Sequence, residues 1–378
     1  MAQCEHIEKF VREVWRWYRI HKRNLPWRDL AIKDDAERAY RIMVSEVMLQ
    51  QTQVSRVIII YKRFLRVFPT LIDLARASNR EVILAWRGMG YNSRVIRLRD
   101  AAREILHRSE SQKSKSTLRR SSGQEREENE IIFPREMEEL MSIPGIGHYT
   151  AAAIRNFAFH LPTPCIETNI RRVLHTKFFG PPEADGTWRV GDRELLKLAD
   201  EVLEVALKFS SSDEAPFDGS PSFAPFRKGG QSSLCAKESR SIKKKSLSTR
   251  PALVGLARRE REGRIARRRH SRRTADWHAA LMDYGSLAIP KIKPRRKVRR
   301  KEPGRMVGSK HIPNRIFRGR IIEELRDAER GLSIHEIGRR VCIDWKPEEH
   351  GGWLLEILNT LEKDTLIQKG GRRFVLRS

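Results

Sequence analysis

The chain has 378 residues, and 76 Lys and Arg residues against 48 Asp and Glu residues give it a formal net charge of +28. A cationic surplus of this size predicts a polyanionic partner and an affinity that falls steeply with salt. No apolar run approaches the length of a membrane-spanning helix, and the first residues lack the apolar core of a secretion signal, so no membrane partner is expected.

The cysteines are few and scattered along the chain, at Cys4, Cys165, Cys235 and Cys342. This spacing is typical neither of a disulfide framework nor of a metal site, and it suits a reducing compartment. We therefore expect a cytoplasmic protein, associated with the nucleoid if the organism is a prokaryote.

Helical periodicity extends from Glu5 to about His107, with few strand signals. Residues 108–130 contain barely an apolar residue and are predicted to be a disordered insertion. Further helices are predicted from Pro134 through Met141, from Thr150 to about Phe159, from Asn169 to Phe179 and from about Asp192 to Lys208.

Residues 210–273 are rich in Ser, Gly, Pro, Lys and Arg and form the second predicted disordered insertion. The apolar pattern returns at 275–285 and is followed by a basic run at 295–301. The C-terminal unit reads as three helices, at 316–326, 333–341 and 353–361, and then a short basic hairpin with Gly370 and Gly371 at its turn. This order is the outline of a winged helix, for which DNA contact and protein interaction are both open.

The stretch from Ser45 to Val54 places one carboxyl group, that of Glu46, in an apolar helical run and follows it with three glutamines. The carboxyl has hydrocarbon neighbours: Val44, Val47 and Met48. Desolvation by such neighbours raises the pKa of a carboxylic acid and keeps it protonated near neutral pH. Gln50 lies one turn further on the same face, where an amide can contact bases or fill the space of an extruded nucleotide. The stretch predicts chemistry on a nucleobase; the alternative is a core glutamate paired with an arginine.

A second motif, Ile143 to Ile154, holds two glycines between predicted helices. Glycines at this spacing let backbone N–H groups approach a phosphate, and the N-terminus of the next helix favours the anion. The residues predicted to contact DNA here are Pro144, Gly145, Gly147 and Thr150. A turn that only packs the helices is the alternative.

A third motif, Ile166 to Val173, places Glu167 just before a helix, where the macrodipole favours the ionised form. One carboxyl group would then be held as the acid and the other as the anion, which separates acid and charge-stabilising functions. The alternative is a helix cap or a surface carboxylate.

These three motifs resemble those of A/G-specific adenine DNA glycosylases, the MutY type of the helix-hairpin-helix superfamily. Leu25-Pro26-Trp27-Arg28 resembles the entry segment of the family, and Gly88 to Arg94 resembles its G-L-G-Y-Y-x-R loop. The resemblance covers roughly Phe10 to Gly285 without the two insertions. It implies that Tyr91 wedges into the DNA helix, and that Gln50, Gln51 and Arg94 also contact DNA. The second tyrosine of the loop is Asn92 here.

The resemblance places the catalytic aspartate of the superfamily at Glu167, whose side chain is longer by one C–C bond of roughly 1.5 Å. In a site that needs sub-ångström placement this departure matters. Bifunctional relatives such as endonuclease III carry a Schiff-base lysine at the position of Tyr149. Tyrosine cannot form that imine, so we expect a monofunctional glycosylase in which Tyr149 helps to orient the site.

Typical members hold a [4Fe–4S] cluster through four cysteines that follow the segment matching Met282 to Gly285. This chain has no cysteine from Ser286 onward in that region, which predicts no iron–sulfur cluster and no metal site. Many members also end in a Nudix-like domain that recognises 8-oxoguanine, where this chain has the winged-helix-like unit.

The predicted fold class is all-α, a two-lobed helix-hairpin-helix DNA glycosylase core with a small C-terminal winged-helix-like α+β domain. The core spans 1–290, with a six-helix lobe at about 30–160 and a second lobe from 1–29, 161–209 and 274–290. A basic linker at 291–311 and the C-terminal domain at 312–378 complete the chain.

The predicted activity is hydrolysis of the N-glycosidic bond of adenine mispaired with guanine or 8-oxoguanine in double-stranded DNA, by a monomer. Glu46 would protonate the flipped base, most plausibly at N7, and Glu167 would stabilise the oxocarbenium-like sugar. One alternative is a thymine or uracil mismatch glycosylase, because thymine-removing relatives also carry tyrosine at position 149. The other is a catalytically inactive DNA-binding protein.

Overall fold

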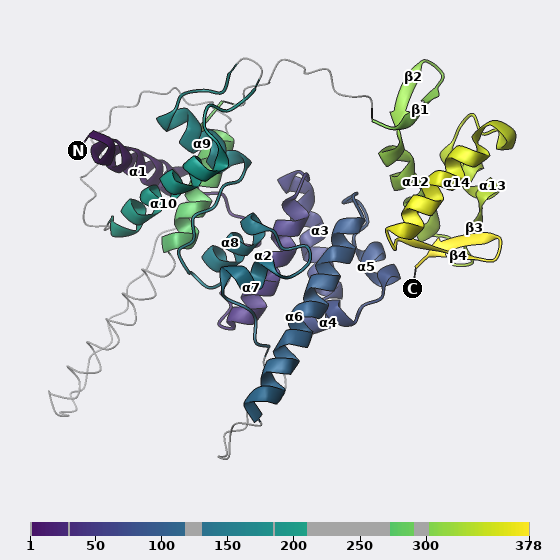
Figure 1. Ribbon diagram of the computed structural model, residues 1–378, viewed down its shortest axis with the longest axis horizontal. Helices are drawn as coiled ribbons and strands as arrows, with labels where there is room; N and C mark the ends of the chain where they lie inside the picture. The colour runs from purple at the N-terminus through teal and green to yellow at the C-terminus, as the bar shows by residue number, and fades with distance from the viewer. Residues whose placement is uncertain are drawn as a thin grey trace, which may run out of the picture.

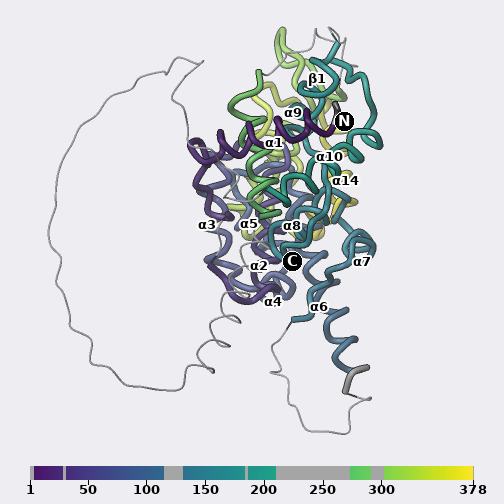
Figure 2. The backbone as a smooth tube through the Cα atoms, turned by 90° about the vertical axis from the view of Figure 1, so that its left-hand side faces the viewer, coloured from purple at the N-terminus to yellow at the C-terminus, as the bar shows by residue number. Residues whose placement is uncertain are grey.

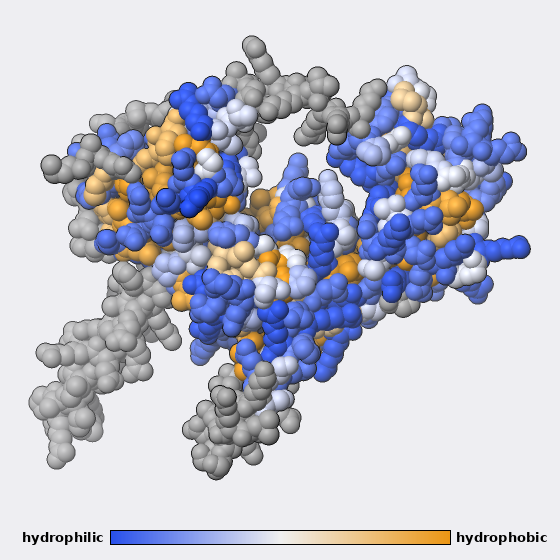
Figure 3. All heavy atoms as spheres, in the orientation of Figure 1, coloured by the Kyte–Doolittle hydropathy of each residue, from blue (hydrophilic) through white to orange (hydrophobic). Residues whose placement is uncertain are grey.

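The computed structural model describes residues 2–28, 31–117, 131–183, 186–209, 273–290 and 302–377. Its N-terminal two thirds are helical within these ranges, and its strands form two small antiparallel sheets near the C-terminus. Figure 1 shows three bodies side by side, and Figure 3 shows a hollow between the two outer ones, above the middle one. No helix in the described ranges is both long and apolar enough to cross a membrane.

The middle body, here called the first lobe, contains seven helices within the described residues. They are α2 (Asp35–Leu49), α3 (Val54–Val67), α4 (Leu71–Arg76), α5 (Asn79–Ala85), α6 (Ser93–Thr117), α7 (Met137–Met141) and α8 (His148–Phe157). The lobe has one helix more than the predicted six. Thr70 and Ser78 each begin a new helix with a capping box, which separates α4 from α5.

The second lobe contains α1 (Ala2–His21), α9 (Thr168–Phe178), α10 (Asp192–Lys208) and the helical residues 273–287. Figures 1 and 2 both place α1, α9 and α10 together at one end of the first lobe. Trp277 is fully buried in the core of this lobe, against Phe10 and Trp15. Gly285 allows close helix packing, because a Cβ at that position would lie 2.6 Å from the carbonyl oxygen of Asn169.

Helix α8 belongs to both cores. Ala151 and Ile154 pack into the core of the first lobe, whereas Ala152, between them in sequence, packs into that of the second. Residues 150–153 in the middle of this helix are small, so both lobes approach its backbone closely there. The helix therefore holds the lobes at a fixed separation, and the space between them becomes the candidate site.

The C-terminal domain is defined here as residues 302–377. It consists of β1 (Gly304–Val307), β2 (Lys310–Pro313), α12 (Asn314–Arg326), β3 (Leu332–Ser333), α13 (Ile334–Val341), α14 (Pro347–Lys363), β4 (Ile367–Gly370) and β5 (Arg373–Leu376). β1 and β2 form a hairpin, and the second sheet has the antiparallel order β3-β5-β4. The three predicted helices and the hairpin at Gly370-Gly371 are present, and β3 was not predicted.

Three predicted boundaries were wrong. Helix α6 continues to Thr117, so residues 108–117 are helical; Arg108 contacts Glu104 one turn back and Ser142 beyond α7. Residues 304–311 of the predicted linker belong to the β1–β2 hairpin, which Gly308 closes with a φ of +57°. Helix α7 begins at Met137, after Pro134. The predicted insertion 210–273 lies outside the described residues except for its last position.

Candidate active site

A cavity of about 370 Å³ lies between the two lobes. This size is within the range of small-molecule sites, about 300–1,000 Å³. It receives side chains from α2, α8, the start of α9 and the helical residues 273–287. The three predicted catalytic residues all line it, Glu46, Tyr149 and Glu167, together with Gln50 and Gln51.

Glu46 lies near the end of α2, and its residue is only 6% exposed. Burial, together with the negative charge of Glu167, raises the pKa of Glu46 to about 7, although the hydrogen bond from Tyr149 and the charge of Arg28 lower it. The backbone N–H groups nearby are already used within the helix. Glu46 therefore carries a proton in a large fraction of molecules at neutral pH, as the sequence predicted.

Glu167 is the N-cap residue of α9. Its Oε1 accepts hydrogen bonds from the backbone N–H groups of Asn169 at 2.7 Å and Ile170 at 2.8 Å. Burial nevertheless raises the pKa of Glu167 above its ordinary value, more than these hydrogen bonds and the charge of Arg172 lower it. The sequence had predicted that the helix N-terminus favours the ionised form. That prediction was wrong in its net direction, because the cap lies inside the cavity instead of at the surface.

Tyr149 in the first turn of α8 donates a hydrogen bond to Glu46. Burial and the two nearby carboxyl groups raise the pKa of Tyr149 well above its ordinary value, so the phenol stays protonated and acts only as a donor. This bond connects α2 to α8 at the wall of the cavity. Tyr149 thus fixes the orientation of the acid.

A buried ionic cluster, which the sequence did not reveal, supports the cavity. Asp283 is fully buried and accepts two hydrogen bonds from the guanidinium of Arg28, at 2.7 and 2.9 Å. Arg23 adds its Nε at 2.6 Å and its backbone N–H at 3.0 Å. Asp283 therefore holds Arg28 beside Glu46. The two motifs were visible in the sequence at 25–28 and 282–285, but nothing in them indicated that they touch.

Arg94 has a different function from the one predicted. The residue is only 9% exposed, and its two Nη atoms donate to Val47 O, Gln50 O and Met89 O, and to Thr52 Oγ1. Its guanidinium is used inside the protein and offers no free cation to a phosphate. It ties the turn after α2 to the loop before α6, so we assign it a positioning function.

Tyr91 projects from that loop. The residue is 52% exposed and has a left-handed φ of +46°, and the guanidinium of Arg94 lies 5.4 Å from its ring centroid. Gln51 in the neighbouring turn also has a positive φ, +55°. Strained backbone of this kind persists where surrounding contacts enforce it, often at binding sites. The arrangement holds an aromatic ring outward next to the cavity.

The predicted hairpin connects α7 to α8. Gly145 has a φ of +92°, a conformation that disfavours other residues, and Pro144 and Gly147 are exposed. Gly147 caps α8 without a side-chain hydrogen bond, so the first N–H groups of the helix face outward. Thr150, by contrast, is only 3% exposed, and its side chain packs into the core. The exposed part of the hairpin therefore lies within 144–148, where Ile146 alone is buried.

The residues that follow the helical segment 273–287 do not fit an iron–sulfur cluster. The four cysteine thiolates that hold a [4Fe–4S] cluster would have to lie close to one another. In the described ranges the cysteines are Cys4 in α1, Cys165 before α9 and Cys342 after α13, and no group of three or more His, Cys, Asp or Glu residues is placed to hold a metal.

Comparison with known proteins agrees with this geometry. Residues 44–186 match the HhH-GPD superfamily base excision DNA repair protein profile. The adenine DNA glycosylase of Mus musculus is 38% identical over 205 residues, which cover 53% of this chain and 35% of that protein. That of Mycolicibacterium smegmatis is 34% identical over 177 residues, 47% of this chain and 52% of that protein.

A solved structure of a thermostable thymine-DNA glycosylase superposes with a TM-score of 0.41 at 22% identity, over 53% of this chain and 80% of that one. The match to the curated relatives is limited in length, since the chain spans about a third of the mouse protein and about half of the mycobacterial one. Residues 44–186 are thus similar to the HhH-GPD superfamily, and about half of the chain is similar to adenine DNA glycosylases.

Proposed function

We propose that the protein is a monofunctional DNA glycosylase that removes adenine mispaired with guanine or 8-oxoguanine. The observation that carries the proposal is the pairing of Glu46, whose pKa is raised to about 7, with Glu167 across one cavity. A nucleobase leaves a sugar as a good leaving group only when it is protonated or otherwise neutralised. A buried acid that keeps its proton near neutral pH meets that need.

In the first step Glu46 transfers its proton to N7 of the flipped adenine. The bond between C1′ and N9 then breaks, and its electron pair leaves with the now neutral base. Tyr149 keeps the donating oxygen of Glu46 in place through its hydrogen bond. A general acid of this kind contributes typically about 10²- to 10⁴-fold to the rate.

In the second step water adds to the positively charged C1′, and its proton passes to the Glu46 carboxylate left by the first step, which restores the acid. Glu167 stabilises the positive charge on the sugar while it exists, as paired carboxylates do in glycoside hydrolysis. The anionic form of Glu167 is supported by the two N–H groups of α9 and by Arg172. No amine lines the site for a Schiff base at position 149, so no strand cleavage accompanies base release.

Double-stranded DNA is the proposed partner, bound by a monomer. The exposed hairpin 144–148 would contact a phosphate, Tyr91 would wedge at the orphaned base, and Gln50 and Gln51 would contact bases or backbone around it. We propose that the three helices and the β4–β5 hairpin of the C-terminal domain are winged-helix-like. We also propose that the enzyme works without an iron–sulfur cluster, in a cytoplasmic or nucleoid-associated setting.

Single-turnover base excision on labelled duplexes tests the proposal. The duplexes carry adenine opposite 8-oxoguanine, adenine opposite guanine, or thymine or uracil opposite guanine, each with and without alkali. Alkali-dependent cleavage at adenine is the expected result. Glu46→Gln is the matched control, because it keeps the size and hydrogen-bonding capacity of the side chain but removes the proton.

Each other outcome decides against part of the proposal. Cleavage only at thymine or uracil would make the protein a mismatch glycosylase of the other kind. Cleavage without alkali would show lyase activity. No release from any duplex, with equal binding by the wild type and Glu46→Gln, would leave a DNA-binding protein without catalysis.

A further inference from the structure

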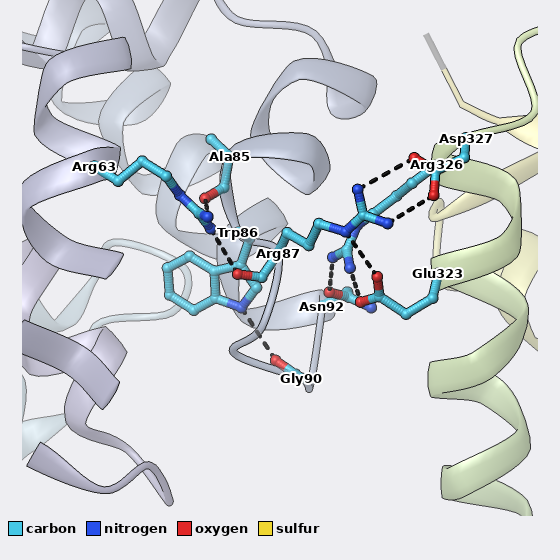
Figure 4. A network of polar contacts seen from close by, with 9 residues as sticks. All are labelled: Arg63, Ala85, Trp86, Arg87, Gly90, Asn92, Glu323, Arg326 and Asp327. Atoms are coloured by element: carbon cyan, nitrogen blue, oxygen red, sulfur yellow. Dashed lines mark hydrogen bonds and ion pairs between the residues drawn. The ribbon is translucent and has the colours of Figure 1, made fainter. Parts of the chain in front are cut away.

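The C-terminal domain is docked onto the first lobe through the loop that carries Tyr91. Figure 4 shows the polar part of this contact. Arg87 forms ion pairs with Glu323 at 3.1 Å and with Asp327 at 2.7 Å, both largely exposed. Beneath them Arg326, only 3% exposed, donates from Nη2 to Asn92 Oδ1 at 3.1 Å.

The Arg326 contact makes the docking rigid. Burial lowers the pKa of Arg326 to about 10, so the guanidinium remains a cation in the interface at neutral pH. Arg326 is also paired with Glu323 of its own helix, so undocking would break its hydrogen bond to Asn92 but leave the ion pair intact. Asn79 adds a hydrogen bond to Thr365 O at 2.7 Å, and apolar residues of both bodies form one continuous core. The C-terminal domain therefore sits in one place relative to Tyr91.

This docking creates a second cavity, of about 540 Å³, beside the candidate active site. Its walls are the turn after α2, the start of α3, the loop 88–93 and α12, together with Leu361 of α14 and Leu366 before β4. Three arginines line it, Arg56 from the first lobe and Arg315 and Arg318 from α12. Gln51 and Thr52 line both this groove and the active-site cavity, so the two sites are adjacent and separated only by that turn.

Helix α12 presents arginines to the groove, whereas the exposed charged residues of α14 are mostly acidic. In a winged-helix arrangement α14 is the third helix, the position that usually enters a DNA groove. Its exposed charged residues are acidic except for one, Glu348, Glu349 and Glu356 against Lys363. Acidic side chains oppose contact with phosphates. The hairpin β4–β5 is basic, but Figure 1 shows it at the end of the domain opposite β1 and β2, away from the hollow of Figure 3.

We propose that this groove binds the phosphate backbone of the DNA strand opposite the one inserted into the active-site cavity. Arg315 and Arg318 of α12 are the cations that hold it, and a phosphate would compete there with their present partners, Glu302 and Asp364. Neither the exposed charged residues of α14 nor the β4–β5 hairpin contacts the DNA. A duplex with one nucleotide in the first cavity must place its other strand nearby, and the groove lies there, beside the exposed ring of Tyr91. The inference rests on the proposed function, because it takes the first cavity to be the one that receives a nucleotide.

The test compares two double variants that each remove two positive charges. One is Arg315→Gln with Arg318→Gln, and the other is Lys369→Gln with Arg372→Gln in the β4–β5 hairpin. Both are made in the Glu46→Gln background, so that the duplex stays intact. Fluorescence anisotropy gives the Kd for an adenine:8-oxoguanine duplex at several salt concentrations. Each lost phosphate contact lowers the slope of log K against log salt by about 0.9.

The α12 variant is expected to lower that slope by up to about 1.8, and the hairpin variant to leave it unchanged. An unchanged slope in the α12 variant overturns the proposal, and so does an equal loss in both variants, which would indicate only a general charge effect. Asp364→Asn is the control for folding, because it removes the ion-pair partner of Arg318 but keeps the cation. It is expected to keep the wild-type slope.

Base excision is also measured with proteins that keep Glu46, because this tests the proposed activity separately from the proposed DNA contact of the groove. If adenine is excised but the salt slope is unchanged in the α12 variant, the proposed DNA contact of the groove is wrong and the proposed activity stands. No excision from any duplex, with the slope lowered as expected, would refute the proposed activity while the groove still binds DNA.

Discussion

Glu46 and Glu167 line the same cavity, but Glu46 lies inside a helix and Glu167 lies at the N-terminus of one. Glu46 lies within α2, where the backbone N–H groups are already bonded and Tyr149 is its side-chain donor. Glu167 lies before α9, where two backbone N–H groups are free to bind its carboxylate. Burial raises both pKa values, so the difference between the two groups is one of degree. The number of N–H groups available at each position, more than depth alone, separates acid from anion.

The largest expected effect comes from removing the acid. Glu46→Gln is expected to lower the single-turnover rate of adenine excision by about 10²- to 10⁴-fold, the usual contribution of a general acid. Binding of the duplex is expected to remain, since the side chain keeps its shape. Excision at the wild-type rate would show that the protonated group is elsewhere.

The next effect comes from removing the stabilising carboxylate. Glu167→Ala is expected to lower the excision rate on the order of 10²-fold, as the loss of one electrostatic stabiliser does in other enzymes. Glu167→Asp is expected to retain most of the rate, because aspartate caps a helix as well as glutamate or better and keeps the charge. A rate for the aspartate variant as low as that for alanine would show that the extra length of Glu167 is essential.

The comparison also shows which parts of the site the sequence could predict. The raised pKa of Glu46 followed from its apolar neighbours within one helix, which are local in sequence. The raised pKa of Glu167 did not, because its burial depends on how α9 packs against α1 and against the helical residues 273–287, which lie more than one hundred residues after Glu167. The local sequence pattern predicted that Glu167 precedes a helix, but it did not predict that the side chain is buried.

Arg94 and the C-terminal domain show the same limit. An arginine after a glycine-rich loop resembles a phosphate ligand in sequence, but here its partners are carbonyl groups of α2 that are more than forty residues away. The three C-terminal helices could be predicted from periodicity, whereas β3 has only two residues, too few for a strand pattern. The contact between Asn92 and Arg326 joins positions 234 residues apart, and no pattern in either segment indicates it.

A smaller effect is expected in the pH dependence. Because Glu46 must be protonated, the excision rate is expected to fall as pH rises through about 7. Tyr149→Phe removes the hydrogen bond that lowers the pKa of Glu46, so this fall should move to higher pH. A hydrogen bond with a net value of about 0.5–1.5 kcal/mol corresponds to a shift of about half to one pH unit. Plots of log rate against pH for both proteins measure it, and a shift to lower pH would contradict the assigned donor.

The effect on stability separates the two carboxyl groups most directly. Glu46 has a folded-state pKa of about 7 against an ordinary value of 4.5, so the folded state disfavours its ionised form. Its contribution to stability is complete below the ordinary value and is lost as pH rises through about 7. Glu46→Gln removes this loss, and the Tm of the variant relative to the wild type should therefore be higher at pH 8 than at pH 4.

Glu167→Gln should respond differently, although the pKa of Glu167 is also raised. The amide relieves the cost of burying a charge, but it exchanges charge-assisted hydrogen bonds from Asn169 and Ile170 for weaker neutral ones. These two changes oppose each other, so the Tm gain between pH 4 and pH 8 should be smaller than for Glu46→Gln. Thermal unfolding of both variants at the two pH values measures the difference. Equal gains would mean that the N–H groups of α9 do nothing to distinguish the two carboxyl groups, and that burial alone sets both.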